Sequence, residues 1–134
     1  ADRIRWEGRS PHVELLRRYD EVDIALDPWP YSGGLTTLEA LWKGVPVITM
    51  PGPTFAGRHA MSHLLNLGLG SLVVESFEAY ADLATLLAGN RGLLRELRYL
   101  LPYSMLTSPL NRWPPIWTRP FAPCGNATAR VCPR

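Results

Sequence analysis

Apolar positions follow two different periods between Arg3 and about Met105. Four short runs are rich in apolar and β-branched residues, as strands are, and the second of them is expected to be buried: residues 3–6, 22–26, 45–49 and 71–74. The stretches between them space their apolar residues three and four apart, which is typical of amphipathic helices. Strands that alternate with helices predict an α/β fold, a parallel sheet flanked by helices. Four strands are too few for a complete doubly wound domain, so we expect a partial one.

Residues that favour helix ends stand where each helical pattern starts or stops. The first helix is predicted over residues 11–19, with Ser10 as its N-cap and Pro11 in the first helical position. Three further helices are predicted over residues 36–43, 54–66 and 77–87, and a fifth after residue 90. Small polar N-caps or terminating glycines bound these helices: Gly44, Gly68, Ser76 and Asn90. Pro102 leaves the end of the fifth helix undecided.

The most informative stretch is residues 27–42, DPWPYSGGLTTLEALW. A strand ends where it begins, a proline-rich loop follows, and two glycines precede a helix that opens with two threonines. This turn is expected at the carboxyl edge of the sheet, where free N–H groups and the helix dipole favour a phosphate. Glu39 lies three residues after Thr36, where its carboxylate could accept hydrogen bonds from ribose hydroxyls. A structural alternative is that Gly33 and Gly34 only form a turn and that Thr36 and Glu39 form a capping box.

Residues 22–49, VDIALDPWPYSGGLTTLEALWKGVPVIT, resemble the signature of the O-GlcNAc transferase/SPINDLY family of glycosyltransferases. Residues 55–59 (FAGRH) and 107–110 (TSPL) are further landmarks in register, so the resemblance runs from about residue 3 to residue 110. It implies the GT-B arrangement, in which two Rossmann-like domains face a cleft, often behind helical repeats. Residues 1–110 are similar to the end of the second domain, which holds the nucleotide-sugar donor.

The resemblance also implies roles for single residues. Thr36 would bind the diphosphate, together with the backbone at Gly34 and Leu35, and Glu39 would hold the ribose. The wall that contacts the base would comprise Ser10, Pro11, His12 and Arg18. An exposed helical histidine without a role is the alternative interpretation of His12. Leu15 and Gly34 stand where the animal enzyme has histidines, so the donor stays open: UDP-GlcNAc is expected first, and relatives use UDP-glucose or GDP-fucose.

The implied reaction is an inverting transfer to Ser or Thr of proteins, and no cofactor is expected. The helix N-terminus at Thr36 would stabilise charge on the leaving group. No residue stands out as the catalytic base. The acceptor hydroxyl and the groups that assist it would meet the donor from the side of a missing N-terminal GT-B domain. The isolated chain is therefore expected to be inactive. Two other functions stay open: a relative that uses another donor or modifies asparagine, and a noncatalytic module that binds a nucleotide sugar or a partner.

Composition narrows the possible partners. Of the 14 basic residues, four follow Leu110 and none of the 12 acidic ones do, so residues 1–110 carry ten basic and twelve acidic residues. That balance gives no electrostatic reason to expect nucleic acid or an anionic membrane as a partner. Both cysteines, Cys124 and Cys132, also follow Leu110. The chain opens with Ala1 and shows no signal peptide, so we expect a fragment or a processed protein in the cytoplasm.

His59 and His63 are four residues apart on a predicted helix, a spacing that can bind zinc. The glutamate of an HExxH motif is absent and no third ligand is evident, so we expect no metal site. Arg58 is expected to make a structural or donor-side hydrogen bond.

The character of the chain changes after Leu110. Six of its 13 prolines lie from Pro109 onward, without helical or strand periodicity. We hypothesise that residues 111–134 form an irregular tail that is read in the wrong frame, because shifted codons can spell a continuation in the style of the family. A divergent natural tail is the alternative.

Overall fold

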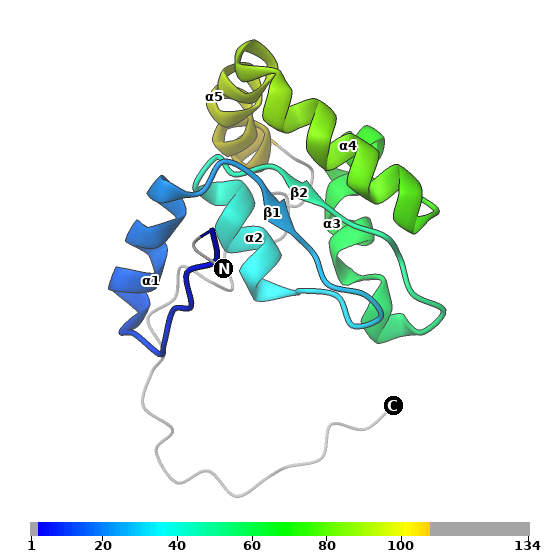
Figure 1. The fold of residues 1–134 in the computed structure, drawn as a ribbon, viewed down its shortest axis with the longest axis horizontal. Helices are drawn as coiled ribbons and strands as arrows, with labels where there is room; N and C mark the ends of the chain where they lie inside the picture. The colour runs from blue at the N-terminus through cyan, green and yellow to red at the C-terminus, as the bar shows by residue number, and fades with distance from the viewer. Residues whose placement is uncertain (1–2, 108–134) are drawn as a thin grey trace, which may run out of the picture.

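The computed structural model describes residues 3–107 of the 134-residue chain. The described elements are the α-helices α1 (His12–Arg18), α2 (Leu35–Trp42), α3 (His59–Asn66), α4 (Phe77–Gly89) and α5 (Arg91–Thr107); the strands β1 (Ala25–Leu26) and β2 (Val47–Ile48); and the 3-10 helices η1 (Tyr19–Glu21), η2 (Phe55–Gly57) and η3 (Gly70–Leu72) (Figure 1). The expected α/β class is confirmed.

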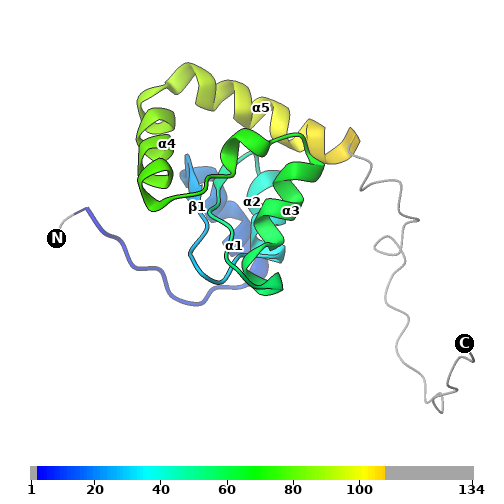
Figure 2. The same cartoon turned by 90° about the vertical axis from the view of Figure 1, so that its right-hand side faces the viewer.

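A small parallel sheet lies at the centre of the fold. β1 pairs with β2 in parallel, with Ala25 opposite Val47, and a single parallel bridge joins Thr49 to Val73 beyond β2. Figure 2 shows α4 on one side of β1 and α2 and α3 on the other, with α5 across the top. Since α5 packs on both α2 and α4, it joins the helices of the two faces. The expected parallel sheet flanked by helices is therefore confirmed, with fewer strands than predicted.

The core gathers around β2 and the helix faces that cover it. Its fully buried apolar side chains come from α2, β2, α3, α4 and α5 and include Leu41, Ile48, Leu64, Leu87 and Leu101. Burying such side chains is worth about 1.5–3 kcal/mol each, so these contacts are the main force that holds the helices on the sheet.

The helix ends follow the sequence closely at four positions. Ser76 accepts a hydrogen bond from the backbone N–H of Ala79, and the Asn90 side chain accepts one from Leu93. Gly44 and Gly68 have positive φ angles of 77° and 74° after α2 and α3. A Cβ on Gly44 would also lie 2.6 Å from the carbonyl oxygen of Arg98, so only glycine allows α5 to pack this closely.

Three of the four predicted strands differ from the structure. Residues 3–6 are not a strand, and Trp6 is 90% exposed, because no described strand lies beside them. Residues 22–26 contain only the two-residue β1, and Leu26 is 56% exposed, so the prediction of a buried strand is wrong. β1 lies at the edge of the described sheet, which leaves one side of it unpaired. Residues 71–74 contribute the end of η3 and the bridge at Val73.

Several helix boundaries differ from the predicted ones as well. α1 begins at His12, Pro11 occupies the N-cap position, and no side chain caps the helix, so Ser10 is not its N-cap. The helix predicted over residues 54–66 is divided into η2 and α3. α5, whose end the sequence left undecided, continues through Pro102 to Thr107, the last residue that the structure describes. The predicted tail, residues 111–134, and most of the TSPL landmark lie outside the described residues.

Candidate functional site

The loop between β1 and α2 is held by a buried carboxylate. Asp27 is 6% exposed and accepts hydrogen bonds from three groups: the hydroxyls of Ser32 (2.9 Å) and Thr49 (2.7 Å) and the backbone N–H of Gly33 (2.7 Å). Three donors offset the cost of burying a charge. Asp27 therefore fixes the two glycines that precede α2 against the end of β2.

Further contacts fix the rest of this loop. The Ser32 hydroxyl, which donates to Asp27, also accepts a hydrogen bond from the backbone N–H of Ala60 in α3 (2.9 Å). The Tyr80 hydroxyl of α4 donates to the carbonyl oxygen of Asp27 (2.9 Å), and burial together with the charge of Asp27 raises the pKa of Tyr80. The Trp29 ring packs edge to face on Phe77, with ring centroids 5.7 Å apart. Sequence reasoning had assigned no role to Asp27 or Ser32.

The N-terminus of α2 is open. Gly34 is its N-cap residue and makes no side-chain cap, and no described residue accepts a hydrogen bond from the backbone N–H groups at positions 35–37. The Thr37 hydroxyl donates to the carbonyl oxygen of Gly33 (2.9 Å), whereas Thr36 is exposed. The capping-box alternative is wrong, because α2 begins at Leu35 and Glu39 bonds elsewhere. Three free donors and the positive end of the helix dipole are thus available to an anion.

Glu39 meets the start of α1. His12 Nε2 lies 2.7 Å from Glu39 Oε1, and the Glu39 side chain is 10% exposed against 64% for His12. The Tyr19 hydroxyl donates to the carbonyl oxygen of Thr36 (3.3 Å). Burial raises the pKa of Tyr19, and the charge of Glu39 raises it further. The structure therefore brings two predicted site segments together, the α1 start after Ser10 and Pro11 and the first turns of α2.

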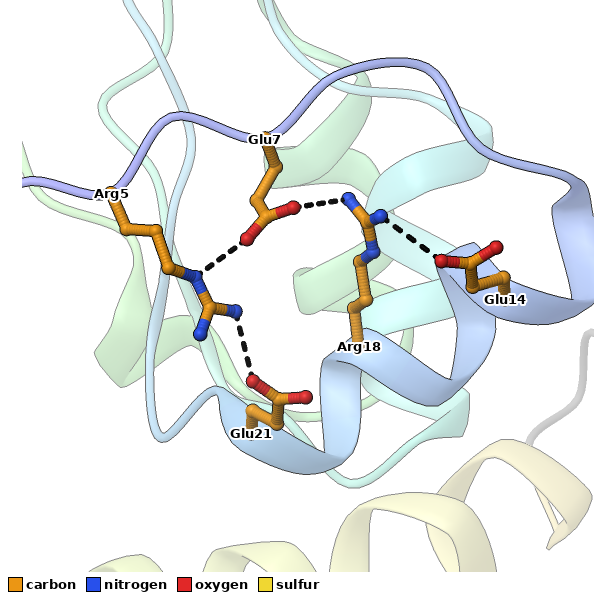
Figure 3. Close-up of polar contacts among 5 residues, drawn as sticks. All are labelled: Arg5, Glu7, Glu14, Arg18 and Glu21. Atoms are coloured by element: carbon orange, nitrogen blue, oxygen red, sulfur yellow. Dashed lines mark hydrogen bonds and ion pairs between the residues drawn. The ribbon is translucent and has the colours of Figure 1, made fainter.

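Arg18, at the other end of α1, points elsewhere. Its guanidinium pairs with Glu7 (2.7 Å) and Glu14 (3.2 Å), and Glu7 also pairs with Arg5, which reaches Glu21 (Figure 3). No contact joins Arg18 to Glu39 among the described residues, and Leu15 on the same helix is 37% exposed. The roles of Arg18 and Leu15 at the base wall stay predictions.

A cavity of about 390 Å³ opens beside the α2 N-terminus. Its lining comes from η1, β1, the following loop, α2 and β2, and includes Tyr19, Leu26, Asp27, Tyr31, Thr36 and Val47. This volume lies within the range of small-molecule sites, which combine a mostly apolar lining with a few placed polar groups.

The residues of the 55–59 landmark lie close to the same loop. Arg58 has a structural contact, since its guanidinium donates to the carbonyl oxygens of Gly52 (3.1 Å) and Pro53 (2.9 Å). Burial lowers the pKa of His63, and the neighbouring His59 lowers it further. Within residues 3–107, no group of three or more His, Cys, Asp or Glu side chains is arranged to hold a metal ion. No helix in the same range is long and apolar enough to cross a membrane.

Known proteins match this chain over the region that carries the site. The model of glycosyl transferase family 41 matches residues 1–113. The relative from Hordeum vulgare, "Probable UDP-N-acetylglucosamine--peptide N-acetylglucosaminyltransferase SPINDLY", is 41% identical over 71% of this chain and 10% of its own length. The SEC protein of Arabidopsis thaliana, named for the same activity, is 41% identical over 84% of this chain and 12% of its own length.

A solved structure of a Thermobaculum terrenum O-GlcNAc transferase mutant superimposes with a TM-score of 0.69 and 45% sequence identity. It covers 72% of this chain, and the match covers 18% of that structure. The chain thus spans about a tenth of the length of the curated relatives and has the fold of a partial Rossmann-like domain. Because the family model matches well over half of the residues, the chain belongs to glycosyl transferase family 41.

Proposed function

We propose that residues 1–110 are the donor-binding part of the second Rossmann-like domain of a GT-B glycosyltransferase. The donor is a UDP-sugar, UDP-GlcNAc in the first instance, and the acceptors are Ser and Thr hydroxyls of proteins. The observation that carries this proposal is the pairing of Glu39 with His12 beside the open N-terminus of α2. Membership of family 41 supports the same function.

The chemistry follows from the groups that this site offers. Thr36 and the free N–H groups at the start of α2 bind the diphosphate, and Glu39 accepts hydrogen bonds from the ribose hydroxyls through the oxygen that His12 leaves free. As the bond to the anomeric carbon breaks, negative charge grows on the diphosphate. Donors that are already in place stabilise that charge without reorganising. The acceptor hydroxyl displaces the diphosphate from the anomeric carbon, and the configuration at that carbon is inverted.

The base of the nucleotide lies along α1 in this proposal. Ser10, Pro11 and His12 form the near part of that wall, while Leu15 and Arg18 lie further along the helix. Arg18 reaches a base only after leaving Glu7 or Glu14, and such exposed pairs are weak enough to exchange.

The acceptor is a separate protein, and its hydroxyl meets the donor from the side of an N-terminal GT-B domain, which also supplies the groups that assist the hydroxyl. Helical repeats precede that domain in the larger polypeptide. The isolated chain is therefore expected to bind the donor weakly and to transfer no sugar. Residues 1–110 contain no cysteine, and for this reason we still predict a cytoplasmic location.

A transfer assay on the intact gene product tests this function. Radiolabelled UDP-GlcNAc, UDP-glucose and GDP-fucose are offered separately with a mixture of acceptor proteins. Label that enters protein from a UDP-sugar and is released by cleavage of O-linked sugars supports the proposal. Transfer from GDP-fucose only, or an asparagine linkage, would replace the proposed donor or acceptor. Binding of donor without transfer would indicate a noncatalytic module.

A further inference from the structure

His59 lies beside the glycine loop, although it comes from a different helix. It is the first residue of α3, and a Cβ built on Gly34 would lie 3.6 Å from His59 Nδ1, an ordinary van der Waals separation. Gly34 is the residue directly before α2. The imidazole therefore lies next to the open N-terminus of α2, where the diphosphate is proposed to bind.

Two contacts, one on the ring and one on the following residue, hold the histidine in this place. The Phe55 ring packs edge to face on the imidazole, with centroids 4.8 Å apart and an angle of 82° between the planes. The next residue, Ala60, donates its backbone N–H to the Ser32 hydroxyl, which ties the first turn of α3 to the loop before α2. No residue in the described range 3–107 is hydrogen-bonded to the imidazole itself. Its polar edge is held in position and is free to bind a ligand.

We propose that His59 is a donor-binding residue that donates a hydrogen bond from its ring to the diphosphate at the start of α2. This inference rests on the proposed function. An imidazole keeps at least one N–H donor in either protonation state, and phosphate oxygens are strong acceptors. Gly34 has no Cβ, which would contact His59 Nδ1 at 3.6 Å, so this residue does not cover the ring nitrogen next to the α2 N-cap. His59 therefore adds a side-chain donor to the backbone donors of α2.

Binding of UDP and of uridine to the intact gene product tests this role, with GDP and guanosine measured in parallel. His59→Ala is expected to weaken nucleoside diphosphate binding about tenfold to a hundredfold, the equivalent of one hydrogen bond to a charged group. Nucleoside binding should stay within about twofold, since the nucleoside lacks the phosphates. His59→Asn keeps an N–H donor and should recover part of the loss. His63→Gln, one turn further along α3, is the matched control and should bind both ligands like the wild type.

The outcomes separate this inference from the function on which it rests. A wild-type protein that binds neither UDP nor GDP overturns the proposed function and this inference with it. Wild-type binding that His59→Ala leaves unchanged overturns the inference alone. An equal loss for diphosphate and nucleoside, without recovery in His59→Asn, would show that His59 only shapes the loop.

Discussion

The two walls of the candidate donor site are built in different ways. We call residues 27–39, the loop before α2 and the first turn of that helix, the α2 wall, and residues 5–21, which contain α1, the α1 wall. The α2 wall rests on buried groups: Asp27 takes three hydrogen bonds, and the hydroxyls of Ser32 and Tyr80 tie the same loop to α3 and α4. The α1 wall has no buried residue and is held by ion pairs of the half-buried Arg18 and of exposed side chains. Two contacts in the candidate site connect the two walls: His12 with Glu39, and the hydroxyl of Tyr19, directly after α1, with the carbonyl oxygen of Thr36.

This difference explains what each wall can do without the rest of a larger protein. Buried hydrogen bonds inside a packed fold resist exchange with water, so the α2 wall is preformed. Exposed ion pairs contribute little to stability and are screened by salt, so the α1 wall is open to adjustment by a ligand or by a further domain. We therefore expect the diphosphate part of the site to be rigid and the base part to adapt.

Breaking the α2 wall should have the largest effect. Asp27→Asn replaces one acceptor oxygen by an NH₂ group that faces hydrogen-bond donors, which leaves buried groups unpaired. We expect the free energy of unfolding of this chain to fall by about 2–4 kcal/mol in urea titrations. Asp82→Asn, at an exposed position of α4, is the control. Equal stability of the two variants would contradict the anchoring role of Asp27.

Cutting the His12–Glu39 contact should have the next largest effect, a loss of donor affinity. Glu39→Ala removes the carboxylate proposed to hold the ribose and is expected to cost about 1–3 kcal/mol in donor binding by the intact gene product, measured by calorimetry. Glu78→Ala, an exposed glutamate in the first turn of α4, should leave donor affinity unchanged. An unaltered affinity in Glu39→Ala would remove the ribose role and leave Glu39 as a partner of His12 alone.

The stability of the fold should also depend on pH through His63 of α3, which packs beside the α2 wall. Burial lowers the pKa of His63 below its usual value of 6.5, so the unfolded chain binds the proton first as the pH falls. Stability should therefore be complete above that value and should decline below it, towards the lower pKa of the folded state. His63→Gln should show a smaller decline in melting temperature over the same range. Parallel curves for the two proteins would assign the decline to other groups.

Breaking the α1 wall should have the smallest effect. Glu7→Gln weakens the pairs with Arg5 and Arg18, and the free energy of unfolding should change by less than about 1 kcal/mol. Faster amide exchange in α1 should accompany it, and high salt should reduce the difference from the wild type. Glu75→Gln, at an exposed position before α4, serves as the control. A loss as large as that of Asp27→Asn would show that the two walls are not different in kind.

The sequence predicted the helices better than the strands, for a physical reason. Helix ends depend on local groups, so the caps at Ser76 and Asn90 and the glycines after α2 and α3 could be identified directly. A strand exists only beside another strand, and no described strand lies beside residues 3–6.

The same distinction applies to the candidate site. The open start of α2 and the position of Glu39 follow from local pattern and from resemblance. The buried network of Asp27 and the approach of His59 to Gly34 depend on tertiary packing between β1, α2 and α3. No spacing in the sequence connects residues 27 and 49, or 34 and 59, so neither contact could be predicted.

A crystal structure of the intact gene product with UDP tests the central claim most directly. We expect the diphosphate oxygens within about 3.2 Å of the Thr36 hydroxyl and the backbone N–H groups at the start of α2, with Glu39 on the ribose. The α2 wall should superimpose on the structure described for this chain, and any movement should be confined to α1. A diphosphate bound elsewhere, with the N-terminus of α2 left empty, would contradict the account.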